Sequence, residues 1–300
     1  MKRIMVTGSN GFVGKHLVAE LQHNNIEVVK IVGSQGDDES LVVDLMDATA
    51  TISIDFTDID AVIHLAALAS NGASFGDPLK YINTNMGMQI NLFESAKMQD
   101  QHPLFLLVSS GSVYDPEEAL PLQETANTKP SSPYAVSKLG QEELGRYYGS
   151  IGFNVIIARP FNHIGPGQSL GFIVPDIAAQ MAAFKQGTVE NIIVGNLDAE
   201  RDFTDVRDIV RAYRLLVDLG KSGETYNVCS GTALSGHDIV SGLAKVFDIK
   251  PKIVVDQKKM RPSDNPVIYG SCEKLRSHTS WQPEIDIATT LEDVVSKMSF

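Results

Sequence analysis

The sequence predicts an α/β fold in which a doubly wound parallel sheet is followed by a smaller C-terminal lobe. In the first half, strand-like apolar runs at 4–6 and 26–32 lie on either side of an amphipathic stretch. This alternation is typical of a parallel sheet that is covered by helices on both faces. After Pro160 the chain changes to loops rich in Gly, Pro and Asn. We therefore expect two lobes, 1–162 and 163–300, with a cleft between them.

The other strands of the sheet are predicted from four further apolar runs, with helical patterns between several of them. Ligands of open α/β sheets bind outside the carboxyl ends of the strands. The residues that follow these runs are therefore the first candidates for a functional site. The runs lie at 41–43, 61–65, 104–108 and 155–158.

The composition is that of a compact globular protein that binds small molecules. Of the 300 residues, 43% are hydrophobic and 21% are charged, and the formal net charge is -12. A negative charge of this size repels nucleic acids and anionic lipids, so we expect neither a nucleic acid nor a membrane as partner. Cys229 and Cys272 lack the spacing of a disulfide framework or a zinc site, and we expect no metal. Without a signal-peptide core or a membrane-spanning run, the sequence favours a cytoplasmic protein.

A glycine-rich loop follows the first predicted strand and opens the first predicted helix. It reads Thr-Gly-Ser-Asn-Gly-Phe-Val-Gly over residues 7–14. Glycine lets the backbone approach a phosphate closely, and the N–H groups at the start of a helix attract negative charge. An ordinary glycine turn is the alternative. The candidate cofactor-binding residues of the loop are Gly8, Asn10, Gly11, Phe12, Val13 and Gly14.

Ser110, Tyr134 and Lys138 form the candidate catalytic centre. Tyr134 and Lys138 are four positions apart in a predicted helix, so their side chains project from one face. An ammonium beside a phenol lowers the phenol pKa from its usual value of about 10, which makes a tyrosine usable as an acid near neutral pH. Ser110 stands at the end of a predicted strand, where its hydroxyl can polarise a carbonyl. A surface Tyr-x-x-x-Lys pattern without function is the alternative.

The glycine loop and the three catalytic candidates resemble the extended branch of the short-chain dehydrogenase/reductases, which includes nucleotide-sugar epimerases, dehydratases and reductases. The resemblance covers nearly the whole chain. It implies a Rossmann-type NAD(P)-binding domain over 1–162 and a lobe over 163–300 that mainly binds the nucleotide sugar. A helix cap is the alternative role for Asp44 and for Asn85. Besides Tyr134 and Lys138, the cofactor-binding residues that the resemblance implies are Asp44, Leu45, Leu65, Ala66, Ala67 and Asn85.

The choice between the two nicotinamide cofactors stays open. An acidic residue at the end of the second strand suits NAD, and a basic residue there suits NADP. Here that place holds Val32, Gly33 and Ser34, which satisfy neither rule. Because no carboxylate stands there to repel a 2′-phosphate, we slightly favour NADPH over NADH.

Three C-terminal motifs resemble those of GDP-4-keto-6-deoxy-D-mannose reductases. The resemblance implies that Asn162, Arg201 and Arg261 bind the diphosphate and the adjoining ribose of a GDP-linked deoxyhexose, because guanidinium groups donate paired hydrogen bonds to phosphate. The alternatives are an ion pair of Arg201 with Asp202 or Asp205, and a surface charge for Arg261. The motifs span 159–167, 195–208 and 261–263. We expect structural roles for His64, Arg207, Asp208 and Trp281.

By this resemblance the chain is an enzyme that uses NAD(P)H to reduce the C4 ketone of GDP-4-keto-6-deoxy-D-mannose to GDP-D-rhamnose. Tyr134 would protonate the nascent alkoxide, Lys138 would hold the nicotinamide ribose, and Ser110 would bind the carbonyl oxygen, which also makes it a substrate-binding residue. A nucleotide-sugar 4-epimerase would use the same three groups, whereas a non-catalytic dinucleotide sensor would need no proton donor. The nucleotide base, the C4 configuration of the product and the pathway stay open.

The resemblance also predicts which reaction is absent and how the chain assembles. Related dehydratases carry an Asp-Glu pair, or a glutamate, after the strand-end Ser or Thr, whereas Ser110 is followed by Gly111 and Ser112. The chain therefore lacks the acid and base that a 4,6-dehydratase needs. The helices predicted around 86–98 and 134–148 match those that pair two subunits in the family, so we expect a homodimer.

Overall fold

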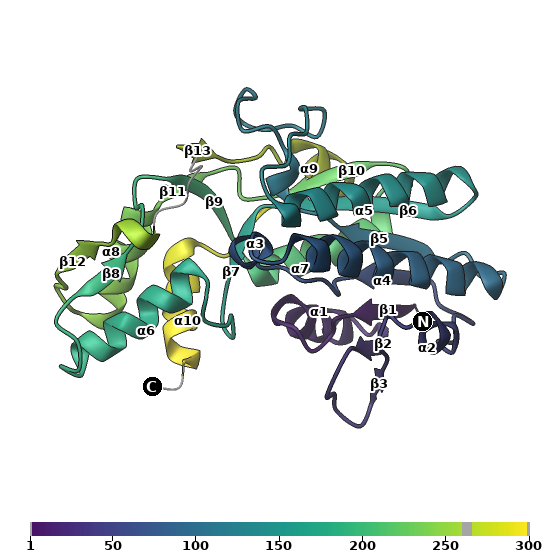
Figure 1. The fold of residues 1–300 in the computed structure, drawn as a ribbon, viewed down its shortest axis with the longest axis horizontal. Helices are drawn as coiled ribbons and strands as arrows, with labels where there is room; N and C mark the ends of the chain where they lie inside the picture. Colours follow the sequence, from purple (N-terminus) through teal and green to yellow (C-terminus); the bar gives the residue numbers. More distant parts are fainter. Residues whose placement is uncertain (1, 260–265, 299–300) are drawn as a thin grey trace.

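A seven-stranded parallel sheet forms the centre of the larger lobe (Figure 1). The computed structural model describes residues 2–259 and 266–298. The strand order is β10-β6-β5-β4-β1-β2-β3, and each neighbouring pair runs parallel. The order reverses between β1 and β4, so the sheet is doubly wound, as predicted. The strands are β1 (Arg3–Thr7), β2 (Glu27–Val32), β3 (Ser40–Val42), β4 (Ala61–His64), β5 (Leu104–Val108), β6 (Asn154–Pro160) and β10 (Thr225–Val228).

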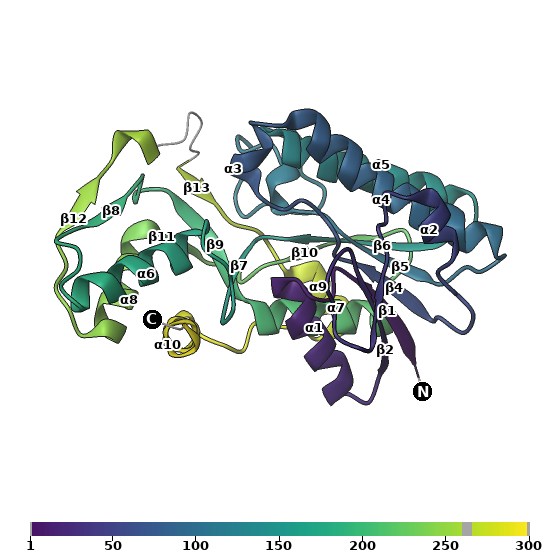
Figure 2. The ribbon, with the colours of Figure 1, turned by 60° about the horizontal axis from the view of Figure 1, so that its bottom comes forward.

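Helices cover both faces of this sheet, as Figure 2 shows. Alternating side chains of β1 point to opposite faces: Ile4 and Val6 enter the core beneath α1 and α7, and Met5 enters the core beneath α4. Trp281 is fully buried in the first of these cores, which agrees with the expected packing role. One face carries α1 (Phe12–His23), α7 (Val206–Leu219) and α9 (Glu273–Thr279), and the other carries α2 (Ala48–Ile52), α4 (Pro78–Met98) and α5 (Pro133–Ser150). Two short helices, α3 (Asn71–Ser74) and η1 (Gly111–Val113), follow β4 and β5.

The smaller lobe has its own sheets, helices and core. Its apolar core includes Ile164, Val174, Met181 and Leu243. In the described part of the chain, one sheet contains β7 (Asn162–Ile164), β9 (Glu200–Asp205), β11 (Ala233–Ser235) and β13 (Val267–Ile268), and a second pairs β8 (Ile192–Val194) with β12 (Ile253–Val255). The helices are α6 (Ile173–Lys185), α8 (Gly236–Phe247), α10 (Ile287–Lys297) and the short η2 (Gln257–Lys259).

The chain passes between the lobes more than once. Beyond residue 163, the elements α7, β10 and α9 return to the larger lobe, where β10 pairs with β6 at the edge of the central sheet. The lobes also meet beside the glycine loop. There the ring of Phe12 stacks on His163 at 6.3 Å between centroids, and Nε2 of His16 lies 2.9 Å from the carbonyl oxygen of Pro166. The second half of the chain therefore contributes to both lobes.

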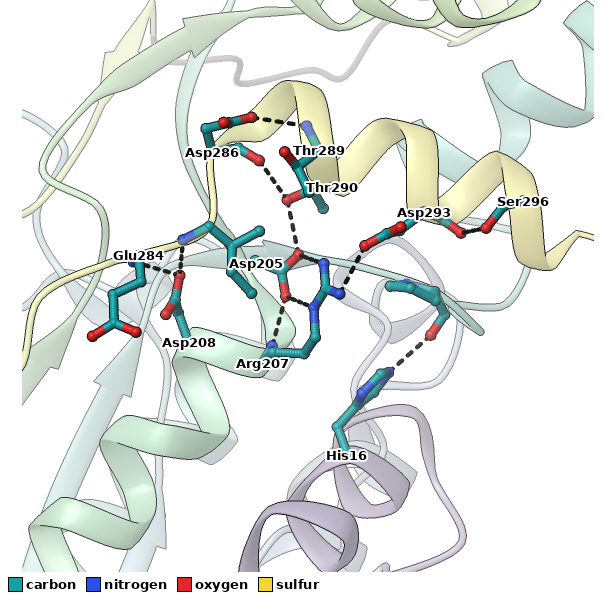
Figure 3. A network of polar contacts seen from close by, with 12 residues as sticks. His16, Asp205, Arg207, Asp208, Glu284, Asp286, Thr289, Thr290, Asp293 and Ser296 are labelled. Carbon is teal, nitrogen blue, oxygen red and sulfur yellow. Dashed lines mark hydrogen bonds and ion pairs between the residues drawn. The ribbon is translucent and has the colours of Figure 1, made fainter. Parts of the chain in front are cut away.

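A partly buried polar network joins the start of α7 to α10 (Figure 3). Asp205 caps α7 and accepts hydrogen bonds from Arg207 and, at 2.8 Å, from the Thr290 hydroxyl. Arg207 also pairs with Asp293 at 2.7 Å. Asp208 accepts the backbone N–H groups of residues 284 and 285, which precede α10. Arg207 and Asp208 thus have structural contacts, as expected.

Candidate active site

The glycine loop between β1 and α1 forms a cradle with no room for side chains. Gly8 has φ +68°, and a Cβ there would lie 3.0 Å from the backbone nitrogen of Ala66. A Cβ on Gly14 would lie only 2.2 Å from the carbonyl oxygen of Gly8. Among the described residues, no side chain caps α1 at Gly11, so the N–H groups of its first turn can bind an anion. This arrangement fits the pyrophosphate of a dinucleotide.

The segment after β2 borders the loop on its other side, and Asp44 follows β3. Asn10 donates a hydrogen bond of 3.0 Å to the carbonyl oxygen of Gln35. Asp44 is exposed, and its carboxylate accepts the backbone N–H of Met46 at 2.9 Å. The alternative interpretation of Asp44 as a helix cap is wrong, because Asp47 caps α2. Asp44 can therefore present its second carboxylate oxygen to a ligand.

A pocket of about 580 Å³ opens between α1 and the segment that joins β2 to β3. Asn10 and Gln35 are among its lining residues. The ammonium of Lys30 in its wall binds Asp37 at 2.7 Å and Glu39 at 3.0 Å. The pocket therefore combines amide groups with one cation and the two carboxylates that bind it. It lies beside the glycine loop and not at the catalytic trio.

The end of β4 is held against the glycine loop by a short hydrogen-bonded chain. The Thr7 hydroxyl accepts the N–H of Ala66 at 3.1 Å and lies 2.8 Å from Nδ1 of His64. Burial lowers the pKa of His64 to about 3, so this histidine is neutral and packed in the core, as expected. Leu65, Ala66 and Ala67 directly follow β4, and the first two border Gly8, where a cofactor backbone would pass.

Asn85 lies inside α4 and is completely buried, so the helix-cap alternative is wrong for this residue too. Its side-chain oxygen accepts the N–H of Leu68 at 2.8 Å, and its amide group donates to the carbonyl oxygen of Leu68 and to the Ser137 hydroxyl. Asn85 therefore fastens the loop after β4 to the helix that carries the catalytic candidates. Its amide is engaged by protein groups.

The structure brings the three catalytic candidates together at the carboxyl edge of the central sheet. Ser110 follows β5, and its hydroxyl accepts hydrogen bonds from the N–H and the hydroxyl of Ser112. Tyr134 and Lys138 occupy one face of α5. The Lys138 ammonium donates a hydrogen bond of 2.8 Å to the carbonyl oxygen of Val108, the last residue of β5. The helix is thereby attached to the strand end at the site.

The pKa of Tyr134 is shifted upward, whereas the sequence predicts a downward shift. Burial raises it to about 12, against an opposing hydrogen bond with Ser110. We expected the Lys138 ammonium to lower this pKa, but it lies 6.0 Å from the ring centroid and is directed at Val108. Burial lowers the pKa of Lys138 itself to about 8, although the nearby Glu142 carboxylate opposes this shift. Desolvation is thus the largest cause of both pKa shifts.

The predicted substrate residues lie on the side of the smaller lobe. Asn162 is exposed at the start of β7, two positions after the end of β6. Arg201 is partly buried on β9, next to β7, and donates a hydrogen bond of 2.8 Å to the carbonyl oxygen of Glu200. Asp205, one of its suggested ion-pair partners, binds Arg207 instead. Arg261 lies outside the described residues.

Sequence reasoning missed a buried cluster behind the catalytic trio. Glu142 stands on α5 four residues after Lys138, and its carboxylate binds the Arg159 guanidinium and the Ser109 hydroxyl. The spacing of Glu142 from Tyr134 and Lys138 placed it on the same helix face, and this signal was visible in the sequence. The partner of Glu142 on β6, Arg159, could not be predicted in this way, because its position depends on how β5 and β6 pair.

Comparison with known proteins identifies the family. A model described as the NAD dependent epimerase/dehydratase family matches residues 4–229. The chain belongs to this family. The match includes the glycine cradle and all three catalytic candidates, and it ends at the residue after β10.

Individual members of the epimerase/dehydratase family match over nearly the full length. The GDP-6-deoxy-D-mannose reductase of Pseudomonas aeruginosa is 37% identical over 98% of this chain and 96% of its own. The GDP-6-deoxy-D-talose 4-dehydrogenase of Aggregatibacter actinomycetemcomitans is 30% identical over 91% of this chain and 90% of its own. A structure described as RMD from Pseudomonas aeruginosa complexed with NADPH superposes with a TM-score of 0.91 at 37% identity, over 99% of this chain and 98% of that one.

Proposed function

We propose that this chain reduces the C4 ketone of GDP-4-keto-6-deoxy-D-mannose with NAD(P)H and forms GDP-D-rhamnose. The observation that carries the proposal is the meeting of Ser110, Tyr134 and Lys138 beside the glycine cradle, at the edge where α/β sheets bind ligands. GDP-D-rhamnose is GDP-6-deoxy-D-mannose, so the 37% identical reductase supports this substrate class.

Each of the three side chains has its own role in the proposed reduction. Tyr134 is protonated at neutral pH, because its pKa is about 12, and it donates its proton to the C4 oxygen as negative charge develops there. The Ser110 hydroxyl turns from its protein partners to hydrogen-bond the same oxygen. Lys138 holds the hydroxyl groups of the nicotinamide ribose. The reduced nicotinamide, when bound, supplies the hydride.

NADPH is the hydride donor that we propose. Gly33 and Ser34 place no carboxylate directly after β2, and in the adjoining pocket the Lys30 ammonium offsets one of the two negative charges of Asp37 and Glu39. A solved relative is complexed with NADPH, which supports the same choice. Steady-state rates with each cofactor test it: a higher kcat/KM for NADPH than for NADH is expected, and the reverse order would reject the choice.

The nucleotide sugar would lie between the lobes with its diphosphate toward the smaller one. We propose Asn162, Arg201 and Arg261 as its ligands, with Ser110 at the sugar. Asn162 and Arg201 stand on the adjacent strands β7 and β9, which supports their acting together. Exposure of Asn162 at the strand end leaves its amide accessible to a phosphate or ribose oxygen.

A nucleotide-sugar 4-epimerase is the second candidate, because the family includes epimerases and the same trio serves both reactions. Incubation with GDP-4-keto-6-deoxy-D-mannose and NADPH separates them. A reductase consumes one NADPH for each sugar reduced, and this is the expected result. A protein that is purified with tightly held NAD and shows no net NADPH consumption would instead be an epimerase.

We also propose that the chain has no dehydratase activity. A side chain at Gly111 would contact the Phe161 ring at 3.1 Å, and Ser112 is hydrogen-bonded to Ser110. Glu117 is exposed and lies within 3.7 Å of Lys129 in the loop beyond. We propose that GDP-mannose with oxidised cofactor stays unchanged, and formation of its 4-keto-6-deoxy product would overturn this.

We also propose a homodimer that forms through α4 and α5. These helices pack side by side on one face of the sheet (Figure 2), and large apolar side chains on them are exposed, including Leu79, Met98, Val136 and Tyr147. A twofold pairing would bury them in a four-helix interface. Light scattering at micromolar concentration should give the mass of a dimer, and a monomer mass would reject the proposal.

A further inference from the structure

A carboxylate and a guanidinium form a fully buried ion pair directly behind the proposed catalytic helix face. Both oxygens of Glu142 are used: one accepts Nε of Arg159 at 2.8 Å and the other accepts Nη2 at 2.7 Å. The Glu142 side chain is 0% exposed and that of Arg159 is 4% exposed. The Ser109 hydroxyl donates a further bond of 2.6 Å to Glu142, and Arg146 donates one of 3.0 Å from the surface.

Such a pair needs an explanation other than stability. Transfer of two charges out of water is costly, and well-packed apolar residues often stabilise a core equally well. Each partner here is connected to an element that carries a proposed site residue. Ser109 precedes Ser110, Glu142 lies one helical turn from Lys138, and Arg159 lies on β6 beside β5.

We infer that Glu142 is a positioning residue of the proposed reductase. Its carboxylate holds the Ser109 hydroxyl and thereby positions Ser110 at the end of β5. Its negative charge also favours the cationic form of Lys138. The expected effect of Glu142 on turnover rests on the proposed function. The expected effect of Glu142 on the charge of Lys138 does not, because it applies to the protein without substrate.

The charged and titratable groups around Lys138 come from several elements. His64 on β4 is neutral because burial lowers its pKa to about 3, and Tyr134 on the same helix is neutral because its pKa is about 12. Arg159 on β6 is a permanent cation that is bound to Glu142. Glu142 remains as the anion, and it raises the pKa of Lys138 against the effect of burial.

Glu142→Gln is the first test, because it keeps the side-chain size and removes the charge. The buried Arg159 cation is then uncompensated, and it disfavours a second cation nearby. We expect the pKa of Lys138 to fall, because the anion that raises it has been removed. Carbon-13 NMR of lysine side chains, with Lys138 assigned through Lys138→Arg, measures this pKa without substrate.

Glu143→Gln is the matched control. Glu143 is the next residue on α5, its side chain is 66% exposed, and it pairs with Arg146 at the surface. The same substitution there should leave the Lys138 pKa within a few tenths of a unit. An unchanged Lys138 pKa in folded Glu142→Gln, as in this control, would reject the charge role whether or not the chain is a reductase.

Two further variants keep the inference testable if Glu142→Gln does not fold. Arg159→Met removes the buried cation that binds Glu142 and leaves the pair with Arg146 at the surface, so the Lys138 pKa should rise. No change or a fall would reject the charge role. Ser109→Ala keeps both charges and removes one contact, so kcat should fall several-fold while the Lys138 pKa is unchanged. Full kcat in Ser109→Ala would reject the positioning of the strand end, provided that the wild-type protein reduces the keto sugar.

Discussion

Tyr134 and Lys138 lie one helical turn apart on α5, with the Lys138 ammonium 6.0 Å from the centroid of the Tyr134 ring. The ammonium is bonded to the end of β5, and the phenol is partly buried next to Ser110. The phenol therefore stays protonated at neutral pH, and its proton is available to an oxygen that gains negative charge at this edge of the sheet.

Tyr134→Phe removes this proton and leaves the ring in place. Because loss of a general acid typically costs a factor of about 10² to 10⁴ in rate, we expect kcat for the keto sugar to fall by that much. The affinity for NADPH should change little, since the ring and Lys138 remain. Stopped-flow reduction and fluorescence titration with NADPH measure the two quantities. Full activity in this variant would remove Tyr134 from the mechanism.

The rate should fall at alkaline pH. Burial lowers the pKa of Lys138 to about 8, so its cationic form predominates below that pH and is lost as the pH rises through it. Tyr134, with a pKa of about 12, keeps its proton over the same interval. We expect kcat/KM to be level near neutral pH and to decline above about pH 8. A profile that stays level to about pH 10 would show that the charge of Lys138 is not required.

Arg201→Met tests the proposed diphosphate site. A hydrogen bond to a charged group contributes about 1.5–3 kcal/mol, so we expect KM for the GDP-sugar to rise about 10- to 100-fold with a smaller change in kcat. KM for NADPH should be unaffected. Lys2→Ala is a suitable control, because Lys2 precedes β1 at the opposite edge of the sheet and pairs with Asp218 at the surface. Equal KM values in both variants would contradict the assignment.

Asp205→Ala should loosen the attachment of α10 shown in Figure 3. It removes a buried acceptor from the Arg207 guanidinium and from the Thr290 hydroxyl, which keep Asp293 and the Asp286 carbonyl oxygen, and we expect a loss of about 1–3 kcal/mol in the free energy of unfolding. Asp293→Ala, which breaks only the more exposed pair with Arg207, should cost about 1 kcal/mol or less. Denaturant unfolding compares them. Equal losses in the two variants would show that the buried contacts of Asp205 add nothing.

Most of the larger lobe and of the catalytic centre could be predicted from the sequence, because these features depend on local patterns. A glycine loop between a strand and a helix, and a Tyr-Lys pair at helical spacing, can each be recognised from neighbouring residues. What the sequence did not reveal depends on contacts between distant segments. Asn85 resembles a cap in sequence, yet its partners are Leu68 and Ser137.

The pKa of Tyr134 and the ion pair of Glu142 with Arg159 also depend on contacts between distant segments. Burial of a side chain, which reverses the expected shift of the tyrosine, is a property of the assembled site. The ion pair forms because β6 lies beside β5 under α5, and this pairing brings together residues from a strand and a helix. The return of α7, β10 and α9 to the larger lobe likewise reflects tertiary packing, which a division at residue 162 does not express.

Hydride transfer to C4 is the central claim, and labelled cofactor tests it most directly. The protein is incubated with GDP-4-keto-6-deoxy-D-mannose and NADPH that carries deuterium at the transferable position of the nicotinamide, and the product is analysed by mass spectrometry and proton NMR. We predict that the product carries one deuterium, bonded to C4, in the D-rhamno configuration. Recovery of the keto sugar without deuterium and without NADPH oxidation, under conditions in which the protein binds NADPH, would contradict the account.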